Sequence, residues 1–378
     1  MLKVGITGQA GFIGTHLFNT LGLFPDKFQR IPFRDEYFKE ASWLREFVKQ
    51  CDTIVHLAAM NRHNNPEVIY NTNIGLVRQL LAACEETKST PHILFSSSTQ
   101  EDRDNLYGKS KKEGRELFEQ WVLNNNAPFT GFVIPNVFGP FGHPYYNSVV
   151  ATFCHQLTHN ETPKIDVDGE IKLIFVGELV SEIIDHIEMM SEEEDTAIAD
   201  TVFVDHSATI KVSSLLSKLE QYKTNYFKNG MIPDLNNSFD RNLWNTFLCY
   251  LDHSNFFPFH LKLNTDSRGS FVETMKLNSG GQVSFSTTKP GITRGNHFHT
   301  RKAERFAVIK GKARIELRRI GTDKVITFNL DGSQPSFVDM PVWYTHNITN
   351  IGEEELYTIF WINEHFNPDD PDTYFEKV

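Results

Sequence analysis

The residues that most restrict the possible folds of this chain lie between Gly291 and Gly311, in the run GITRGNHFHTRKAERFAVIKG. His297 and His299 are two positions apart, so on an extended strand both side chains lie on one face. Glu304 follows five residues later and can return to that face if the chain turns, and His346 offers a further imidazole. Imidazoles together with a carboxylate suit Zn²⁺, Fe²⁺ or Mn²⁺. The pattern predicts strands around a metal site; the alternative is a hydrogen-bonded His/Glu cluster without metal.

This spacing resembles the first motif of the cupin family, G-x5-H-x-H-x4-E-x6-G, at every defined position. Pro341, His346 and Asn350 match the second cupin motif, G-x5-P-x-G-x2-H-x3-N. Pro335 and Trp343 stand where that motif has its two glycines. The resemblance implies an all-β double-sheet roll that binds a divalent metal, with Zn²⁺ expected. The ligands would be His297, His299, Glu304 and His346.

The length and charge of the chain limit what else it can be. A chain of 378 residues exceeds one ordinary core and predicts two domains. The net charge of −11 argues against nucleic acid or an anionic membrane as a partner. No apolar run approaches the ~20 residues that a membrane span requires. The four cysteines show no CxxC spacing and the first residues, MLKVGITG, already form a strand pattern, so we expect a cytoplasmic protein with reduced thiols.

The first half of the chain alternates apolar strands with amphipathic helices. Leu2–Thr7 is an apolar run that leads into the spacing Gly8-x2-Gly11-x2-Gly14 and then a helical pattern. Gly11 allows the backbone to approach a pyrophosphate, and Gly14 allows the helix to pack closely on the strand. Further strands are expected at 28–33, 53–58, 92–97 and 128–134, and helices at 42–50, 68–86 and 107–123. This succession predicts an α/β fold with a doubly wound Rossmann-type parallel sheet that binds a dinucleotide.

Tyr107 and Lys111 are spaced i and i+4 on a predicted helix, so their side chains share one face. A phenol with an ordinary pKa near ~10 is a poor acid–base catalyst at neutral pH unless a cation favours the phenolate. Lys111 can supply that charge and can also bond the nicotinamide ribose. The serine run 96–98 ends the preceding strand and can hold a substrate carbonyl oxygen.

This half resembles the extended short-chain dehydrogenase/reductase family. The resemblance rests on Thr7–Gly14, His56–Ala59, Asn73, Phe95–Ser98, Tyr107-x3-Lys111 and Pro135–Pro140. It implies Tyr107 as the acid/base, Lys111 as the ribose ligand and Ser98 as the assisting hydroxyl, with Ser97 and Thr99 as alternatives. The implied cofactor-binding residues are Gly8, Gly11, Phe12, Ile13, Gly14, Arg34, Leu57, Ala58, Ala59, Tyr107 and Lys111. Only residues 99–106 separate the serines from Tyr107, fewer than in nucleotide-sugar epimerases. The resemblance therefore does not define the loop on the substrate side.

The end of the second expected strand bears on the choice of nicotinamide. An acidic residue there usually bonds a free ribose 2′-hydroxyl, whereas arginine suits a 2′-phosphate. Arg30 and Arg34 precede Asp35, so both signals are present. We expect NADPH, because Arg34 can form forked hydrogen bonds with a phosphate. The alternative is that Arg34 and Asp35 are a solvated pair.

The stretch after Gly139 is rich in histidine, tyrosine and asparagine. In extended reductases this region helps to cover a sugar nucleotide. The resemblance therefore implies substrate contacts by Ser97, Asn136, His143 and Asn147, with Tyr145 as a further candidate. An ordinary aromatic lid packed on a helix at 149–157 is an equally good interpretation.

Beyond residues 243–255 the period of the apolar side chains changes from 3.6 to 2. We expect a reductase domain at 1–245 and a cupin domain at 255–378. Extended termini in such rolls often pair between protomers, so a homodimer is expected. Strands of the second domain are expected at 282–288, 305–310, 313–319, 325–329, 337–340 and 356–362.

A short-chain reductase followed by a cupin resembles the CapF-type capsular polysaccharide synthesis enzymes over nearly the whole chain. Further resemblance lies in Ser97–Gln100 and Gly142–Val150. It implies C3 epimerisation of a UDP-4-keto-6-deoxy-N-acetylhexosamine in the cupin domain and then NADPH-dependent reduction of the C4 ketone, towards UDP-N-acetyl-L-fucosamine.

Two alternatives stay open. In one, the protein is a plain NAD(P)H-dependent nucleotide-sugar reductase whose cupin is a non-catalytic dimerisation module. In the other, the cupin binds Fe²⁺ for oxygen chemistry, which usually requires an open 2-His-1-carboxylate face; His346 argues against it. Four protein ligands favour a structural metal, because catalytic zinc usually keeps an open position.

Overall fold

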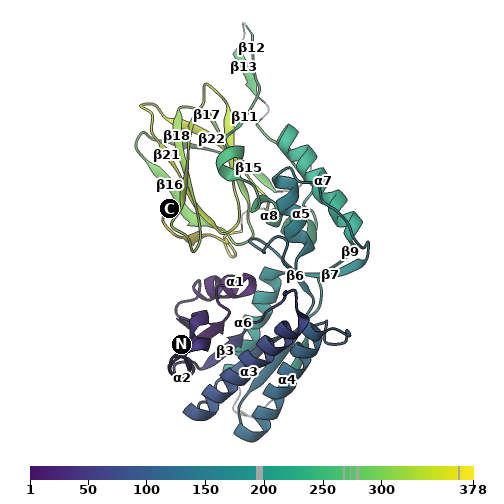
Figure 1. Cartoon of the computed structure of the whole chain (residues 1–378). Helices are drawn as coiled ribbons and strands as arrows, with labels where there is room; N and C mark the ends of the chain where they lie inside the picture. The colour runs from purple at the N-terminus through teal and green to yellow at the C-terminus, as the bar shows by residue number, and fades with distance from the viewer. Residues whose placement is uncertain (193–198, 267–268, 273, 278–280, 365–366) are drawn as a thin grey trace. The chain divides into compact units, whose positions relative to one another are not determined.

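The computed structural model describes residues 1–192, 199–266, 269–272, 274–277, 281–364 and 367–378 (Figure 1). The chain divides into two compact units. The first consists of Met1–Phe138, Gly142–Val149 and Glu170–Ile210, and the second of Gly139–Phe141, Val150–Gly169 and Lys211–Val378. The expected domain limits at 245 and 255 stay a prediction.

The first unit is built on a six-stranded parallel sheet with the order β2-β1-β3-β4-β5-β8. Parallel strands are covered by helices on both faces, so they are continuous apolar runs, and every residue of β3 and β5 is buried. The strands are β1 (Leu2–Thr7), β2 (Phe28–Ile31), β3 (Thr53–His56), β4 (His92–Ser98), β5 (Phe129–Ile134) and β8 (Ala199–Phe203).

The helices of this unit follow from the strand order. Because crossovers are right-handed and the connection from β1 to β2 runs opposite to those among β3, β4 and β5, α1 lies on the other face from α3 and α4. Indeed α3 packs against α4 and α2, whereas α1 packs with α6. The direction reverses between β1 and β3, which is where such sheets bind ligands. The elements are α1 (Phe12–Leu21), η1 (Asp35–Lys39), α2 (Ala41–Val48), α3 (Pro66–Thr87), α4 (Leu106–Asn125) and α6 (Val176–Glu192), with a small sheet of β6 (Asn136–Phe138), β7 (Glu170–Phe175) and β9 (Ala208–Lys211).

The second unit contains two five-stranded antiparallel sheets that face each other (Figure 1). One has the order β11-β20-β17-β22-β15, and the other β19-β18-β21-β16-β23. All residues of β20 and β21 are buried. The strands are β11 (Phe259–His260), β15 (Gln282–Thr288), β16 (Thr293–Phe298), β17 (Glu304–Lys310), β18 (Lys312–Arg319), β19 (Val325–Asp331), β20 (Ser336–Met340), β21 (Tyr344–Asn350), β22 (Leu356–Ile362) and β23 (Tyr374–Phe375).

Helices and short strand pairs complete the second unit. Helix α7 packs on α8 through aromatic rings, with Tyr222 and Tyr226 edge-on to Trp244. Among the described residues, no helix of either unit is long and apolar enough to cross a membrane. The helices are α5 (Val149–Thr158), α7 (Val212–Asn229), α8 (Ser238–Leu248) and α9 (His253–Phe256), and the short strands are β10 (Met231–Ile232), β12 (Leu263–Asp266), β13 (Gly269–Val272) and β14 (Lys276–Leu277).

The predicted fold class is confirmed: a Rossmann-type parallel sheet is followed by an all-β arrangement of two sheets. The strands expected at 2–7, 282–288 and 356–362 match β1, β15 and β22 at both ends. Helix α8 begins at Ser238, because the Asn237 side chain caps it by accepting from Asp240 N at 2.8 Å. Strand β23 is too short to show a period and was not expected.

A buried ion pair joins neighbouring strands of the second unit. Arg305 in β17 donates through Nε and Nη2 to the carboxylate of Asp339 in β20, at 2.7 and 3.0 Å. Arg305 Nη1 also donates to the carbonyl oxygen of Gly230, which ends α7, at 2.7 Å. The guanidinium lies 3.8 Å from the centre of the Phe337 ring. Arg305 therefore connects α7 to the sheet from inside the core, where it is 1% exposed.

We expect Asp339→Ala to lower the free energy of unfolding by about 3–5 kcal/mol, because it leaves a buried guanidinium without its counter-charge. Urea unfolding followed by tryptophan fluorescence measures this. The double variant Arg305→Met/Asp339→Leu should lose less than the single one, because no unpaired charge remains buried. A single variant as stable as the parent would show that the pair contributes nothing.

Candidate functional site

The turn between β1 and α1 is shaped for close approach by a ligand. Gly8 has a φ of 69°, and a Cβ there would lie 2.8 Å from the backbone nitrogen of Ala58. A Cβ at Gly14 would lie 2.3 Å from the carbonyl oxygen of Gly8. Both positions therefore require glycine. Helix α1 starts directly after this turn at Phe12 without a side-chain cap, so its first N–H groups face the place where a pyrophosphate would bind.

The loop that follows β3 is held beside this glycine turn. Thr7 Oγ1 lies 2.7 Å from His56 Nδ1 and accepts from Ala58 N at 3.3 Å. The Asn73 side chain accepts from Met60 N at 2.7 Å and donates to Met60 O at 3.1 Å. These bonds fix the loop carrying the expected cofactor residues Leu57, Ala58 and Ala59. The structure thus brings them together with Gly8, Gly11, Phe12, Ile13 and Gly14.

The two arginines near the end of β2 differ in their surroundings. Arg30 donates to the carbonyl oxygen of Phe18 at 3.1 Å, and its guanidinium lies 4.3 Å from the centre of the Phe18 ring. Arg34 is exposed just before η1. Asp35 is exposed as well, and with the described residues neither side chain forms a hydrogen bond or ion pair, so the alternative of a solvated pair stays open. Arg34 is the arginine available to a phosphate.

Tyr107, Lys111 and Ser98 come together at the start of α4. Asn105 caps this helix by accepting from Gly108 N at 2.8 Å, which places Tyr107 in the first turn. Lys111 Nζ donates to Ser96 O at 2.8 Å and lies 5.9 Å from the centre of the Tyr107 ring. Burial raises the pKa of the Tyr107 phenol to about 12, although a hydrogen bond with the Ser98 side chain acts in the opposite direction. Burial lowers the pKa of Lys111 to about 8.

The protonation states of Tyr107 and Lys111 at neutral pH are those that the donation of a proton requires. At neutral pH the Tyr107 phenol keeps its proton, whereas the Lys111 ammonium is still mostly charged. A phenol that releases its proton to a substrate oxygen becomes a phenolate, and the nearby ammonium stabilises that charge. The site can therefore act as the acid in the reduction of a ketone.

Ser97 lies on the other side of β4 from Ser96 and Ser98, because side chains alternate along a strand. Its hydroxyl donates to the carboxylate of Glu101, which Arg115 holds through Nε at 3.1 Å and Nη2 at 2.9 Å. Sequence reasoning missed Glu101 and Arg115, because no period relates them. They brace the loop that leads to Tyr107. The expected contact of Ser97 with substrate stays a prediction.

The other expected substrate residues lie on exposed segments of the first unit. Arg62 donates through Nη1 to the carbonyl oxygens of Tyr145 and Tyr146, and Tyr146 Oη accepts from Asn61 N at 3.1 Å. The segment with His143 and Asn147 is thus held against the loop after β3. Asn136 donates to Lys172 O at 3.2 Å. Their roles stay predictions.

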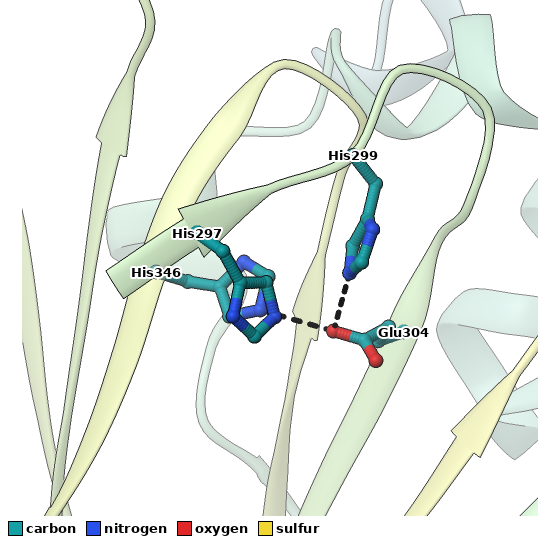
Figure 2. A group of neighbouring side chains, drawn as sticks. All are labelled: His297, His299, Glu304 and His346. Atoms are coloured by element: carbon teal, nitrogen blue, oxygen red, sulfur yellow. Dashed lines mark ion pairs between the residues drawn. The ribbon is translucent and has the colours of Figure 1, made fainter. Parts of the chain in front are cut away.

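Four side chains of the second unit meet at one point (Figure 2). His297 lies at the end of β16, His299 follows that strand, His346 lies in β21, and Glu304 begins β17. A bulge between Gly295 and His297 shifts the register so that His297 pairs with His346. One nitrogen or oxygen atom from each of the four lies within 4.8 Å of the others.

The donor atoms of this cluster fit a divalent cation. Among the described residues, no hydrogen-bond partner satisfies the buried atoms His299 Nε2, Glu304 Oε2 and His346 Nε2, although Glu304 Oε2 lies 3.0 Å from His346 Nε2 and 3.3 Å from His299 Nε2. The Nδ1 atom of His299 faces the carbonyl oxygen of Asp372, and that of His346 lies 3.2 Å from Tyr344 O. A carbonyl only accepts, so Nδ1 carries the proton and the Nε2 lone pair points into the cluster.

The pKa shifts of Glu304 and His297 also favour metal binding. Burial opposes ionisation of Glu304, but the facing imidazoles of His299 and His346 outweigh it and hold the pKa of the carboxyl well below its usual range. Burial, with His346 and His299 adding to it, lowers the pKa of His297 to about 4. At neutral pH the cluster therefore offers a carboxylate and a neutral His297 imidazole, which are the metal-binding forms.

Each half of the chain matches a family of known proteins. The model of the NAD dependent epimerase/dehydratase family matches residues 4–195, and that of the polysaccharide biosynthesis C-terminal domain matches residues 264–374. A UDP-2-acetamido-2,6-beta-L-arabino-hexul-4-ose reductase from Pseudomonas aeruginosa is 33% identical over 381 residues, covering 99% of this chain and 98% of the relative. The crystal structure of the capsular polysaccharide assembling protein CapF from Staphylococcus aureus is 34% identical, with a TM-score of 0.62 and full coverage of both chains. The chain belongs to the CapF-type family.

Part of the chain shares its fold with a wider group. A UDP-glucose 4-epimerase from Thermotoga maritima is 17% identical, with a TM-score of 0.53, and the match covers 66% of this chain and 98% of that one. At that identity the likeness concerns the fold alone. In this CapF-type chain the Tyr107 site and the His/Glu cluster belong to different compact units, so each can be altered by itself.

We expect His297→Ala to lose bound metal, because a site of four ligands then has three. Elemental analysis of the purified protein after dialysis measures the stoichiometry. His260→Ala is the matched control, because His260 is an exposed histidine of β11 outside the cluster. Full metal content in His297→Ala would reject this ligand assignment.

Reductase activity should fall in alkaline solution. The pKa of Lys111 is lowered to about 8, so its positive charge is present below that pH and is lost above it. We expect kcat/KM for oxidation of the reduced nicotinamide cofactor to fall about tenfold per pH unit beyond that point, as for loss of one essential proton. Lys111→Arg keeps its charge, so the activity that it retains should not show this decline. A parent profile that stays flat to pH 9.5 would contradict the role of the Lys111 charge.

Proposed function

We propose that this chain is a bifunctional nucleotide-sugar enzyme of capsular polysaccharide synthesis. A UDP-4-keto-6-deoxy-N-acetylhexosamine is first epimerised at C3 in the second unit. The C4 ketone is then reduced with NADPH in the first unit, towards UDP-N-acetyl-L-fucosamine. The observation that carries the proposal is the alignment along 98% of the reductase from P. aeruginosa, whose name specifies a UDP-hexul-4-ose, in a chain with both an acid–base site and a buried His/Glu cluster.

Reduction needs a proton for the C4 oxygen, and in this proposal Tyr107 gives it. Its phenol is protonated at neutral pH, so it has a proton to give. Ser98 lies beside the phenol and can bond the same oxygen, while Lys111 stabilises the phenolate that forms. When bound, NADPH supplies the hydride that the ketone carbon accepts. The exposed guanidinium of Arg34 supports NADPH over NADH, because among the described residues it has no partner to exchange for the 2′-phosphate.

The chemistry fixes the order of the two steps. A proton at C3 is acidic only while C4 is a ketone, because the resulting charge is shared with the carbonyl oxygen. Epimerisation must therefore precede reduction. When bound, a divalent cation supplies positive charge, either to a developing oxyanion or to brace the two sheets, and four protein ligands favour bracing.

A plain reductase with a non-catalytic second unit is the second candidate. It is favoured by the name of the relative from P. aeruginosa, which specifies a reductase alone. The two candidates differ in one observable, the exchange of the C3 proton without NADPH. Assembly as a cytoplasmic homodimer stays a prediction for both.

We expect the C3 proton of the keto sugar to exchange in deuterated buffer without NADPH, faster than in buffer alone, as followed by NMR. Tyr107→Phe should keep this exchange and lose NADPH oxidation, because only the reduction uses the phenol. Tyr70→Phe removes a hydroxyl elsewhere in the same unit, where it bonds Glu113, and should keep both activities. NADPH consumption without any exchange would leave the plain reductase. Loss of both activities in a folded Tyr107→Phe protein would contradict independent sites.

A further inference from the structure

The segment between two of the expected metal ligands is held by hydrogen bonds from its backbone to distant side chains. Residues Thr300–Ala303, here called the spacer, separate His299 from Glu304. The N–H groups of Thr300, Arg301 and Lys302 all donate to the carboxylate of Asp372, at 3.1, 3.0 and 3.2 Å. The next N–H, that of Ala303, donates to Asn363 Oδ1 at 3.2 Å. Every amide of the spacer is thus bound by a side chain from a distant part of the sequence.

Asp372 contacts both the spacer and a ligand. Its carboxylate also accepts from Thr300 Oγ1 at 2.6 Å, while its main-chain carbonyl accepts from His299 Nδ1. The residue is only 3% exposed and has a φ of 43°, a backbone conformation that surrounding contacts must hold for any residue with a side chain. The carboxylate fixes where this carbonyl lies. One residue therefore shapes the spacer with its side chain and sets the tautomer of His299 with its backbone.

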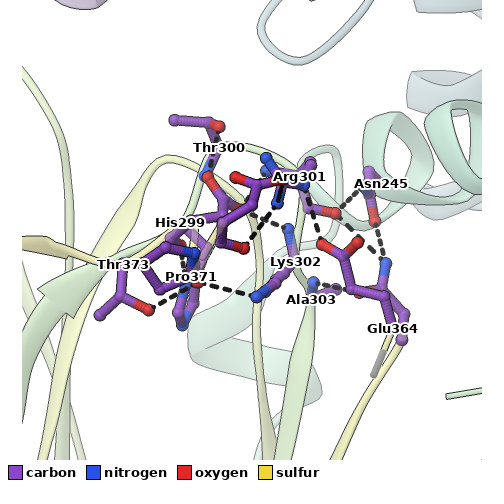
Figure 3. A network of polar contacts seen from close by, with 12 residues as sticks. Asn245, His299, Thr300, Arg301, Lys302, Ala303, Glu364, Pro371 and Thr373 are labelled. Carbon is purple, nitrogen blue, oxygen red and sulfur yellow. Dashed lines mark hydrogen bonds and ion pairs between the residues drawn. The ribbon is translucent and has the colours of Figure 1, made fainter. Parts of the chain in front are cut away.

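Neighbouring residues anchor Asp372 to the ligand strands. Lys302 Nζ donates to Pro371 O at 2.7 Å (Figure 3). Strand β23 pairs with β16, so that Phe375 lies opposite His297. Glu376 N then donates to Asn296 O at 2.9 Å, and its carbonyl accepts from Thr345 Oγ1, next to His346. Segment 370–378 thus contacts the two strands that carry His297 and His346, and it contacts His299 directly.

We propose that Asp372 is a positioning residue of the metal centre. Four residues can connect two ligands in many conformations, and the backbone N–H groups of this spacer donate to the side chains of Asp372 and Asn363, which lie outside it. The Asp372 carboxylate selects the turn that returns Glu304 to the imidazoles, and its carbonyl aims His299 Nε2 at the same point. The inference rests on the proposed metal site. It extends that site to a residue that does not touch the ion.

A merely structural role for Asp372 makes a different prediction. If the carboxylate only holds segment 370–378 to the sheet, its removal lowers stability and leaves the ligand geometry as it was. If it positions the ligands, its removal weakens and distorts metal binding. Metal affinity and the ligand-field spectrum separate the two roles, because stability by itself changes neither.

The test uses the full chain, stripped of metal, as the parent, Asp372→Ala and Asp369→Ala. Asp369 is an exposed aspartate of the same region and serves as the matched control. Each protein competes for Zn²⁺ with a chromophoric chelator and is titrated with Co²⁺, whose visible absorption reports coordination geometry. We expect Asp372→Ala to bind Zn²⁺ about 10–100-fold more weakly, as for loss of a partner that orients a ligand. Its Co²⁺ spectrum should change in shape or intensity, while Asp369→Ala matches the parent.

Thr300→Val decides the matter if Asp372→Ala does not fold. It removes the hydroxyl that donates to the carboxylate and keeps the shape of the side chain, so a smaller loss of affinity in the same direction is expected. Parental Zn²⁺ affinity and Co²⁺ spectrum in a folded Asp372→Ala protein, or in Thr300→Val where that protein does not fold, would overturn the positioning role and leave the metal site intact. A parent protein that binds neither metal would reject the proposed metal site, and the role of Asp372 with it.

Discussion

The meeting of one carboxylate with three imidazoles is the contact on which the second unit depends. Glu304 belongs to β17, in one sheet, whereas His297 and His346 belong to β16 and β21, in the other. Buried apolar side chains such as Val308, Ile315 and Ile348 share the inward faces of their strands with these ligands, and apolar side chains pack without preferred direction. The contact between the Glu304 carboxylate and the imidazoles, in contrast, does have a direction. It specifies how the two sheets lie against each other, and it requires that the turn leading to Glu304 be held in one conformation.

How far the sequence predicts this site depends on which contacts are local. The two-residue period of a strand places His297 and His299 together, and the spacing to Glu304 allows a return. The turn itself is invisible in the local sequence, because Asp372 and Asn363 form it from about 60–70 positions away. The network of Ser97, Glu101 and Arg115 escapes prediction for the same reason. Such contacts have no period, so only the folded chain reveals them.

The first unit was predictable to a greater degree, because its strands are buried on both faces and its helices are long. Tyr107, Lys111 and Ser98 meet because a helix and a strand each place side chains by simple periods. The choice between Arg30 and Arg34 was not predictable. Both stand near the end of β2, and only the packing of Arg30 on Phe18 shows that one of them is already engaged.

Glu304 and Arg305 are neighbours on β17 and therefore face opposite sides of its sheet. One carries a negative charge to the imidazoles, and the other a positive charge to Asp339 and Gly230. A slip of β17 by one residue would exchange the two, bringing a guanidinium against the imidazoles and a carboxylate against Asp339. Both contacts would then be repulsive or unpaired within a buried environment. Adjacent residues of opposite charge thus specify the register of β17, because misaligned pairing of this strand is unfavourable on both of its faces.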